Sequence, residues 1–192
     1  MKEKIGVVRG SGNVFRDLGH TNADAEQFKA ILAAEIIKAL DEAGLVVWLD
    51  GGWAVDAVLE VQTRKHDDLD IVLADVEGLL AALAPKGFAV VDGELHTNFV
   101  LGDAGGRRID AHVVNFDDEG NGIFQMLGGG EWVFPAAGFE GIGTVAGQRV
   151  RCLTPEVQMQ CHANGYEWTQ TDFQDMRALR DRFGVELPEA YR

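Results

Sequence analysis

Lys65-His66-Asp67-Asp68-Leu69-Asp70-Ile71-Val72-Leu73 is a cluster of aspartates that runs directly into an apolar segment. The apolar part predicts a buried strand, and side chains along a strand alternate between its two faces. We therefore expect Asp68 and Asp70 to point the same way, whereas Asp67 points to the opposite face. The stretch predicts a pair of neighbouring carboxylates at the start of a buried strand.

A third carboxylate, Asp110, is expected from a neighbouring strand. It lies in Arg107-Arg108-Ile109-Asp110-Ala111-His112-Val113-Val114, which we predict to form a hairpin with residues 96–101. Hard divalent cations such as Mg²⁺ prefer carboxylate oxygens and substrate phosphates. Asp68, Asp70 and Asp110 are therefore candidate metal ligands. A solvated strand edge or turn can have the same composition, so this interpretation needs a second motif.

The second motif is Gly51-Gly52, which stands between the apolar run Leu45–Leu49 and a predicted helix, Trp53–Glu60. Glycines at such a junction let the backbone approach a ligand, and a helix N-terminus offers free N–H groups to an anion. Most glycine pairs are only turns. Beside the aspartates, this pair predicts a site for nucleotide phosphates.

Several other residues near these motifs can each be interpreted in two ways. Arg64 and His66 could contact phosphate oxygens as cationic clamps, or Arg64 could be a surface residue and His66 a packing residue. His112 shares a strand face with Asp110, so it reaches a substrate pocket beside the carboxylates or is a satisfied core histidine. Tyr166 and Glu167 could line that pocket or merely end a helix. We expect Lys65 on the surface and Trp53 in the core.

The order of predicted elements is mixed strands first and helices last, which indicates the α+β class. We expect a helix from Thr21 or Asn22 to Gly44, and a last helix that begins at Thr171, forms a capping box with Gln174 and ends at Gly184. The remaining expected elements are a strand over 69–74, a helix over 76–83, a strand over 88–91, short strands and loops over 115–142, a hairpin of 144–145 with 149–153, and a helix start at Thr154-Pro155-Glu156.

Composition limits the classes of function. The 192 residues are 46% apolar, with no apolar run of the roughly 20 residues that span a bilayer. No secretory signal follows the N-terminal charges, so we expect a cytoplasmic protein that does not bind membranes. Cys152 and Cys161 are expected to be reduced and structural. The net charge of −14 disfavours nucleic acid and favours metal ions and cationic substrates.

The two motifs together resemble a known family. Gly51-Gly52-Trp53-Ala54-Val55-Asp56 followed by Gln62-Thr63-Arg64-Lys65-His66-Asp67-Asp68-Leu69-Asp70-Ile71 is similar to the signature of the aminoglycoside and lincosamide nucleotidyltransferases, members of the DNA polymerase beta superfamily. The tail, with Gly165-Tyr166-Glu167, Asp172, Asp175-Met176 and residues 183–191, is similar to theirs. The resemblance covers roughly Leu45 to Arg192.

The resemblance implies a polymerase-beta-like mixed sheet flanked by helices, and a Mg²⁺-dependent transfer of AMP from ATP. Gly51 and Gly52 match the motif that holds the triphosphate, and Asp68 and Asp70 match the two metal ligands. Asp110 matches the third acidic position, which can ligate metal and act as general base. The implied partner is a small hydroxylated, cationic acceptor such as an aminoglycoside or lincosamide.

The N-terminal part departs from this pattern. Residues 11–44 resemble the start of bacterial helix-turn-helix antitoxins and stop before any recognition helix. We expect 1–44 to be an arm and helix that pack or form a homodimer contact, and 45–192 to be the nucleotidyltransferase domain, with a helical tail from about 154. Two alternatives stay open: a toxin–antitoxin-type enzyme that modifies a protein or tRNA, and a non-enzymatic binding protein.

Overall fold

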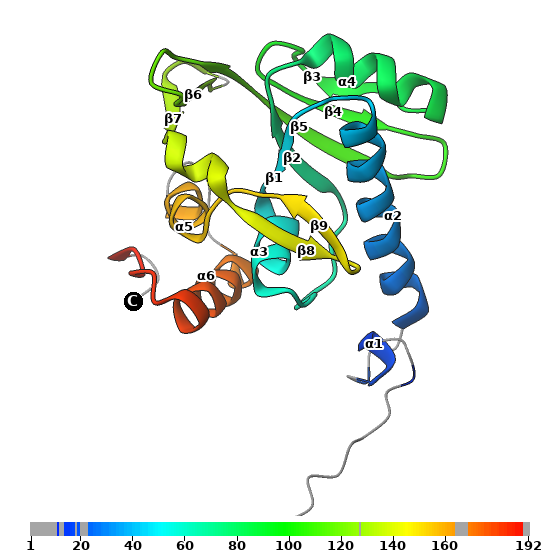
Figure 1. Ribbon diagram of the computed structural model, residues 1–192, viewed down its shortest axis with the longest axis vertical. Helices are drawn as coiled ribbons and strands as arrows, with labels where there is room; N and C mark the ends of the chain where they lie inside the picture. Colours follow the sequence, from blue (N-terminus) through cyan, green and yellow to red (C-terminus); the bar gives the residue numbers. More distant parts are fainter. Residues whose placement is uncertain are drawn as a thin grey trace, which may run out of the picture.

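The computed structural model describes residues 11, 14–17, 19, 23–126, 128–163 and 169–189, and Figure 1 shows the arrangement of their elements. Most of the N-terminal arm, including the expected helix caps Thr21 and Asn22, lies outside these residues. Tyr166 and Glu167, two candidates for the acceptor pocket, also lie outside them.

A mixed sheet forms the centre of the fold (Figure 1). Its strands follow the spatial order β1-β2-β5-β4-β3, in which β2 and β5 are parallel and the other neighbours are antiparallel. The end of β5 also pairs with β6, which pairs with β7, while β8 and β9 form a separate hairpin. The bounds are β1 (Val47–Leu49), β2 (Leu69–Leu73), β3 (Ala89–Gly93), β4 (Asn98–Gly102), β5 (Arg108–Phe116), β6 (Gly122–Gln125), β7 (Glu131–Phe134), β8 (Ile142–Val145) and β9 (Gln148–Arg151).

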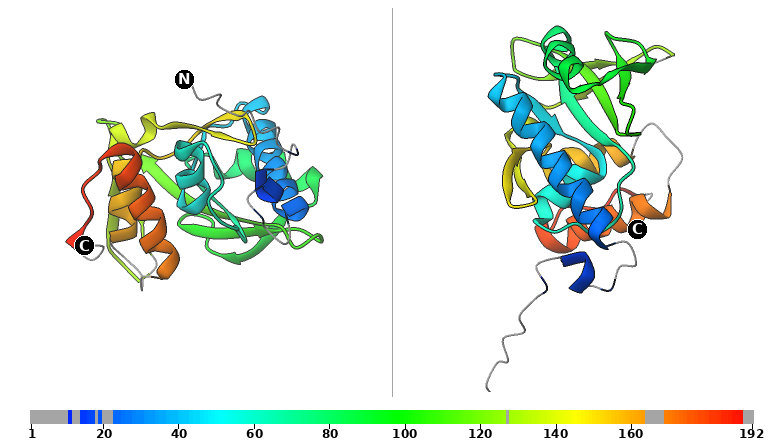
Figure 2. Two further views of the ribbon diagram at one scale, coloured as in Figure 1. Left: turned by 90° about the horizontal axis from the view of Figure 1, so that it is seen from below. Right: turned by 90° about the vertical axis from the view of Figure 1, so that its right-hand side faces the viewer.

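Helices flank this sheet, and α3 occupies the middle of the molecule. Seen from below, α3 lies between α2 and the pair formed by α5 and α6 (Figure 2). The helices are α1 (Val14–Asp17), α2 (Ala23–Glu42), α3 (Gly51–Leu59), α4 (Val76–Leu83), α5 (Pro155–Ala163) and α6 (Gln170–Phe183), with short 3₁₀ turns η1 (Ala84–Lys86) and η2 (Ala136–Glu140). None of the helices in the described ranges has the length and apolar character needed to cross a membrane.

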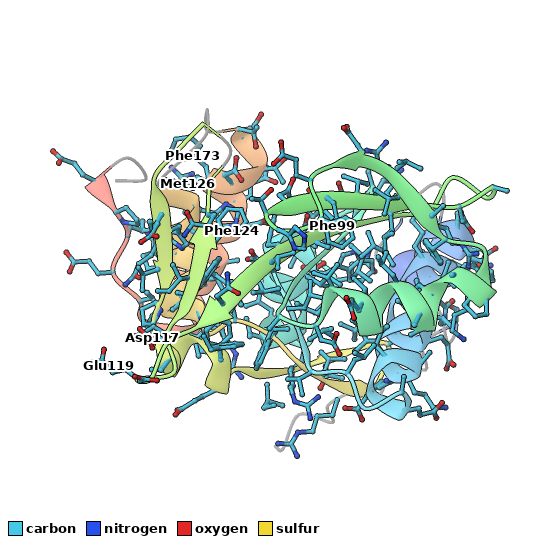
Figure 3. The ribbon with its side chains drawn as sticks, turned by 90° about the horizontal axis from the view of Figure 1, so that it is seen from above. Phe99, Asp117, Glu119, Phe124, Met126 and Phe173 are labelled. Atoms are coloured by element: carbon cyan, nitrogen blue, oxygen red, sulfur yellow. The ribbon has the colours of Figure 1, made fainter. Side chains whose placement is uncertain are left out.

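The alternation of side chains gives β2 two different faces, one in the main core and one that carries Asp70. Ile71 and Leu73 of β2 join the main core with apolar residues of α2, α3 and α4. Phe99 of β4, which Figure 3 labels near the middle of the sheet, is fully buried in the same core. The other face of β2 carries Asp70 and Val72. The apolar requirement of the core therefore fixes which way the carboxylate points.

The predicted α+β class and most predicted elements are confirmed. The expected N-terminus of α6 is wrong: the helix is capped by Thr169, and the capping box uses Asp172. The Asp172 carboxylate accepts from the backbone N–H of Thr169 at 2.7 Å, while the Thr169 hydroxyl accepts from the backbone N–H of Asp172. Thr169 and Thr171 are each followed three residues later by a possible capping-box partner, Asp172 and Gln174. The charged carboxylate of Asp172 is a stronger acceptor than the amide of Gln174. Gly184 ends the helix as predicted.

Both cysteines are free thiols, in agreement with the expectation that they are reduced. Burial raises the pKa of Cys152 to about 12, so its thiolate is not accessible near neutral pH. Cys161 is partly buried, and burial likewise raises its pKa. Neither thiol has the environment of a nucleophile.

Candidate active site

The N-terminus of α3 lies directly against Asp70. Gly51 opens the helix with φ +56°, a backbone conformation that side chains rarely adopt. A Cβ at Gly51 would also collide with the carboxylate of Asp70. The preceding residue, Asp50, caps the helix and accepts from the backbone N–H of Gly51 at 2.8 Å. The predicted glycine pair therefore brings the helix end and the second aspartate into contact.

Gly52 leaves room for two side chains of the loop that leads to β2. A Cβ at this position would collide with the guanidinium of Arg64 and with Nδ1 of His66. Both side chains thus pass close to the first turn of α3. The sequence predicted this proximity, but the two side chains differ in what they offer to a ligand.

Arg64 remains 27% exposed and lines a pocket of about 450 Å³ at the N-terminus of α3. His66 is only 5% exposed. Its Nε2 lies 2.5 Å from Oδ2 of Asp56, and its ring stacks against Trp53 with centroids 4.4 Å apart. The expected phosphate contact of His66 is therefore corrected to a packing role, because the buried ring is held by Asp56 and Trp53. Trp53 itself is buried, as predicted.

Asp70 and Asp110 are direct neighbours in the sheet. They are paired positions of the parallel strands β2 and β5. Asp68 precedes β2 and is exposed, and its backbone carbonyl accepts from the indole N–H of Trp53 at 2.9 Å. Burial, together with the charges of Asp68, Asp50 and Asp110, raises the pKa of Asp70 to about 7. The charges of Asp68 and Asp110 therefore act on the ionisation of Asp70.

These carboxylates do not form a finished metal cage. Within the described part of the chain, no group of three or more His, Cys, Asp or Glu residues is placed to hold a metal ion. Asp110 instead accepts a hydrogen bond from the side-chain amide of Asn98 at 2.6 Å. Asp70 and Asp110 are therefore neighbours in the sheet, and the metal role of the three carboxylates stays a prediction.

His112 follows Asp110 on the same face of β5. Its Nδ1 lies 3.4 Å from Oδ2 of Asp50, and its Nε2 lies 3.9 Å from Oδ1 of Asp110. Burial opposes its protonation, but the hydrogen bond and charge of Asp50, with the charges of Asp110 and Asp70, raise its pKa to about 9. The ring of Phe124 meets it edge-on, with centroids 5.6 Å apart. His112 is thus a cation among the carboxylates.

The apolar ring of Phe124 lies next to His112. Phe124 of β6 and Met126, the first residue after β6, lie on the side of the molecule where Phe173 of α6 is also seen (Figure 3). Phe124 and Phe173 are partly buried, and Met126 is 38% exposed. Asp117 and Glu119, in the turn after β5, lie away from Met126 and Phe173 in the same view.

The pocket contains functional candidates that sequence reasoning missed. It is lined by Asp50, Gly51, Gly52, Arg64, Asp70, His112, Cys161, His162, Thr169, Thr171 and Asp172. Nδ1 of His162 lies 2.9 Å from the carboxylate of Asp172, and Arg64 forms an ion pair with Asp175. Asp50 could have been noticed because it directly precedes the glycine pair. Asp172 and Asp175 belong to the tail that resembles the family, but no local pattern indicates that Asp175 pairs with Arg64 or that His162 lies at this site.

Comparison with known proteins identifies relatives over most of the chain. Residues 31–179 match the family model described as aminoglycoside-2''-adenylyltransferase. A lincosamide resistance protein of Staphylococcus haemolyticus is 26% identical over 147 residues, which cover 76% of this chain and 90% of that protein. A 2''-aminoglycoside nucleotidyltransferase of Klebsiella pneumoniae is 36% identical over 122 residues, which cover 63% of this chain and 65% of that protein.

Solved structures show the same architecture. The lincomycin-bound lincosamide antibiotic adenylyltransferase LnuA is 26% identical with a TM-score of 0.67, over 79% of this chain and 95% of that chain. ANT(2'')-Ia in complex with adenylyl-2''-tobramycin is 25% identical with a TM-score of 0.63, over 82% of this chain and 90% of that chain. The fold around the carboxylates is therefore that of nucleotidyltransferases.

Proposed function

This chain belongs to the aminoglycoside-2''-adenylyltransferase family, and from this premise we propose that it transfers AMP from ATP to a hydroxyl of an aminoglycoside or lincosamide antibiotic. Family membership makes it a nucleotidyltransferase with a nucleoside triphosphate as co-substrate. The particular antibiotic, the use of ATP and the residue roles given below are our proposals.

One observation carries the proposal: Asp70 and Asp110 are paired on β2 and β5, and Asp70 touches the glycine that opens α3. A helix N-terminus attracts phosphate through its free N–H groups and its dipole. A carboxylate pair beside it supplies oxygen ligands for a cation that accompanies the phosphates. This combination suits a nucleotide triphosphate better than a neutral ligand.

The donor set fits a divalent cation such as Mg²⁺. Asp68, Asp70 and Asp110 offer hard oxygen atoms, and burial together with repulsion from Asp68, Asp50 and Asp110 raises the pKa of Asp70 to about 7. A cation held by these side chains would relieve that repulsion. When bound, it would neutralise charge at the attacking and leaving oxygens of the transfer.

We assign each residue of the site a role in the transfer. The acceptor hydroxyl oxygen forms a bond to the α-phosphorus of ATP, the bond from that phosphorus to the bridging oxygen breaks, and pyrophosphate leaves. We assign Asp110 as the base that receives the hydroxyl proton, since it lies on the open face of β5 beside Asp70. Gly51, Gly52 and Arg64 are assigned to the phosphates, and His66 keeps the loop that carries Arg64 in place.

The two antibiotic classes are both represented among the relatives, so both belong in the proposal. The net charge of −14 favours acceptors that carry amines, because carboxylates attract and orient cations. The alternative of a toxin–antitoxin-type enzyme that modifies a protein or tRNA is not supported by these relatives and is not proposed further.

A transfer assay tests the proposal. The protein is incubated with MgATP and a panel of aminoglycosides and lincosamides, and mass spectrometry looks for an acceptor heavier by one AMP. We expect an adduct with at least one acceptor and an equal amount of released pyrophosphate. Absence of an adduct with every acceptor, for a protein that is folded and binds ATP, would overturn the proposed acceptor class.

A further inference from the structure

Arg64 and Asp175 connect the loop before β2 with the C-terminal helix α6. Nε and Nη2 of Arg64 donate to Oδ2 of Asp175 at 3.0 and 2.9 Å, and Nε also reaches Oδ1 at 3.3 Å. The Asp175 side chain is 2% exposed, whereas that of Arg64 is 27% exposed. The carboxylate is thus the fixed end of the pair, and the guanidinium is the end that reaches solvent.

The guanidinium also stands over the first turn of α3. Its Nη2 and Cζ occupy the space that a side chain on Gly52 would need. Its Nη1 donates to the backbone carbonyl of Lys65 at 3.1 Å, which fixes the plane of the group from a second side. Arg64, Gly52 and Asp70 line the same pocket. A planar guanidinium has more N–H donors than these bonds use, so donors remain for an anion in the pocket.

We infer that Asp175 is a positioning residue for nucleotide binding: it holds one edge of Arg64 so that the opposite edge faces the phosphates of the triphosphate and the departing pyrophosphate. This inference rests on the proposed function, because it takes the pocket at α3 as the triphosphate site. It assigns to α6, which is remote in sequence from both motifs, a part in that site.

The negative charges of the pocket explain why Arg64 has to be held in place by Asp175. Asp50, Asp70 and Asp172 line it together with Arg64, His112 and His162, and Asp68 and Asp110 add to the negative potential at Asp70. Phosphates bound at α3 must overcome this potential. An arginine that is already oriented loses less side-chain freedom on binding than one that must be ordered by the ligand.

A purely structural ion pair that fastens α6 to the loop makes different predictions. Loss of a structural pair lowers the melting temperature and impairs every substrate alike. Loss of a positioning residue weakens the binding of ATP and pyrophosphate but leaves the KM of the acceptor unchanged. It has no further effect on binding once Arg64 is absent.

The test is a double-mutant cycle on the full chain with Asp175→Asn, Arg64→Ala and the double variant. Calorimetry measures binding of MgATP without acceptor and of magnesium pyrophosphate. We expect each single variant to weaken both ligands roughly tenfold, the loss of about one charge-assisted hydrogen bond. The double variant is expected to bind as weakly as Arg64→Ala alone. Asp181→Asn is the matched control, because Asp181 lies on α6 and pairs only locally with Arg180.

Arg64→Lys keeps the cation and the fold should Asp175→Asn not yield folded protein. Lysine cannot hold Asp175 with one edge and a phosphate with the other, so the same loss of pyrophosphate affinity is expected. Unchanged ATP and pyrophosphate affinities in these variants, or equal effects of Asp175→Asn with and without Arg64, would overturn the inference.

Its failure can be told apart from failure of the proposed function. If the wild-type protein binds ATP but modifies no antibiotic, and the variants show the expected coupling between Arg64 and Asp175, the acceptor class is refuted and the role of Asp175 is supported. A protein that modifies antibiotics with no coupling between the two residues would refute only the role of Asp175. Wild-type protein that does not bind ATP would refute both.

Discussion

At the scale of single residues, Asp70 is a carboxylate that lies among other carboxylates. Burial and three neighbouring carboxylates raise its pKa from 3.8 to about 7. Between these values the folded protein keeps a proton that the unfolded chain has lost. The contribution of Asp70 to stability therefore falls as the pH rises through this window. Under the proposed function Asp70 is a cation ligand, so its ionisation without the cation lowers the stability of the fold.

We predict that Asp70→Asn abolishes AMP transfer and raises the melting temperature of the metal-free protein. The gain is expected at pH 8 in the presence of EDTA, and it should shrink as the pH falls toward the pKa of the unfolded aspartate. Differential scanning calorimetry at a series of pH values measures it. A gain that is equal at pH 4 and pH 8 would contradict the electrostatic explanation, and retained transfer would contradict the metal role.

His112 has the opposite effect on stability, because its positive charge is stabilised in the folded protein by the negative charge of Asp50. Its pKa rises from 6.5 to about 9, so its contribution to stability is complete below 6.5 and is lost as the pH rises through about 9. We predict that His112→Gln lowers the melting temperature at pH 6 and changes it little at pH 10. Thermal denaturation at both pH values tests this, and an equal loss at pH 10 would indicate a packing effect instead.

At the scale of elements, the N-terminus of α3 depends on the absence of a side chain at its second position. We predict that Gly52→Ala displaces Arg64 and His66, lowers stability by about 1–3 kcal/mol and weakens ATP binding. Gly105→Ala is the control, because a Cβ there meets only Asp103 at ordinary contact distances. Urea denaturation and ATP titration give the two quantities, and an unaffected Gly52→Ala would contradict the crowded geometry.

The start of α6 offers a second test at this scale. Thr169→Ala removes the cap hydroxyl and is expected to lower the free energy of unfolding by about 1 kcal/mol. Thr171, the cap expected from the sequence, lies inside the helix, so Thr171→Ala should change it by less than about 0.5 kcal/mol. Chemical denaturation compares the variants. The reverse order would restore the original assignment.

At the scale of the whole molecule, the net charge of −14 bears on the proposed binding of a cationic acceptor. We predict that the KM of a polycationic aminoglycoside rises several-fold between low salt and about 0.5 M salt, where screening shortens the range of attraction. The KM of ATP is not expected to rise with it, because ATP is an anion. Steady-state kinetics with sucrose as a neutral control measures this, and a salt-independent KM would show that the acceptor is not steered by charge.

The tertiary structure also places α2 in the same core as the sheet. Its buried residues, from Ala30 to Leu40, pack with β1, β2 and α4. The predicted boundary between an N-terminal arm and the enzyme domain therefore separates residues that share a hydrophobic core. The proposed dimer contact of residues 1–44 stays a prediction.

Local patterns of the sequence determined the α+β class, the glycine pair at the start of α3 and the position of Asp70 and Asp110 on neighbouring strands. These features follow from periodicity and backbone freedom, which depend on residues close together in the chain. Only the tertiary structure decided that His66 is buried against Asp56, and that Arg64 meets Asp175, a residue 111 positions away. The first pair depends on how the loop before β2 folds onto α3, and the second on how α6 packs beside that loop. Packing of this kind leaves no local signal in the sequence.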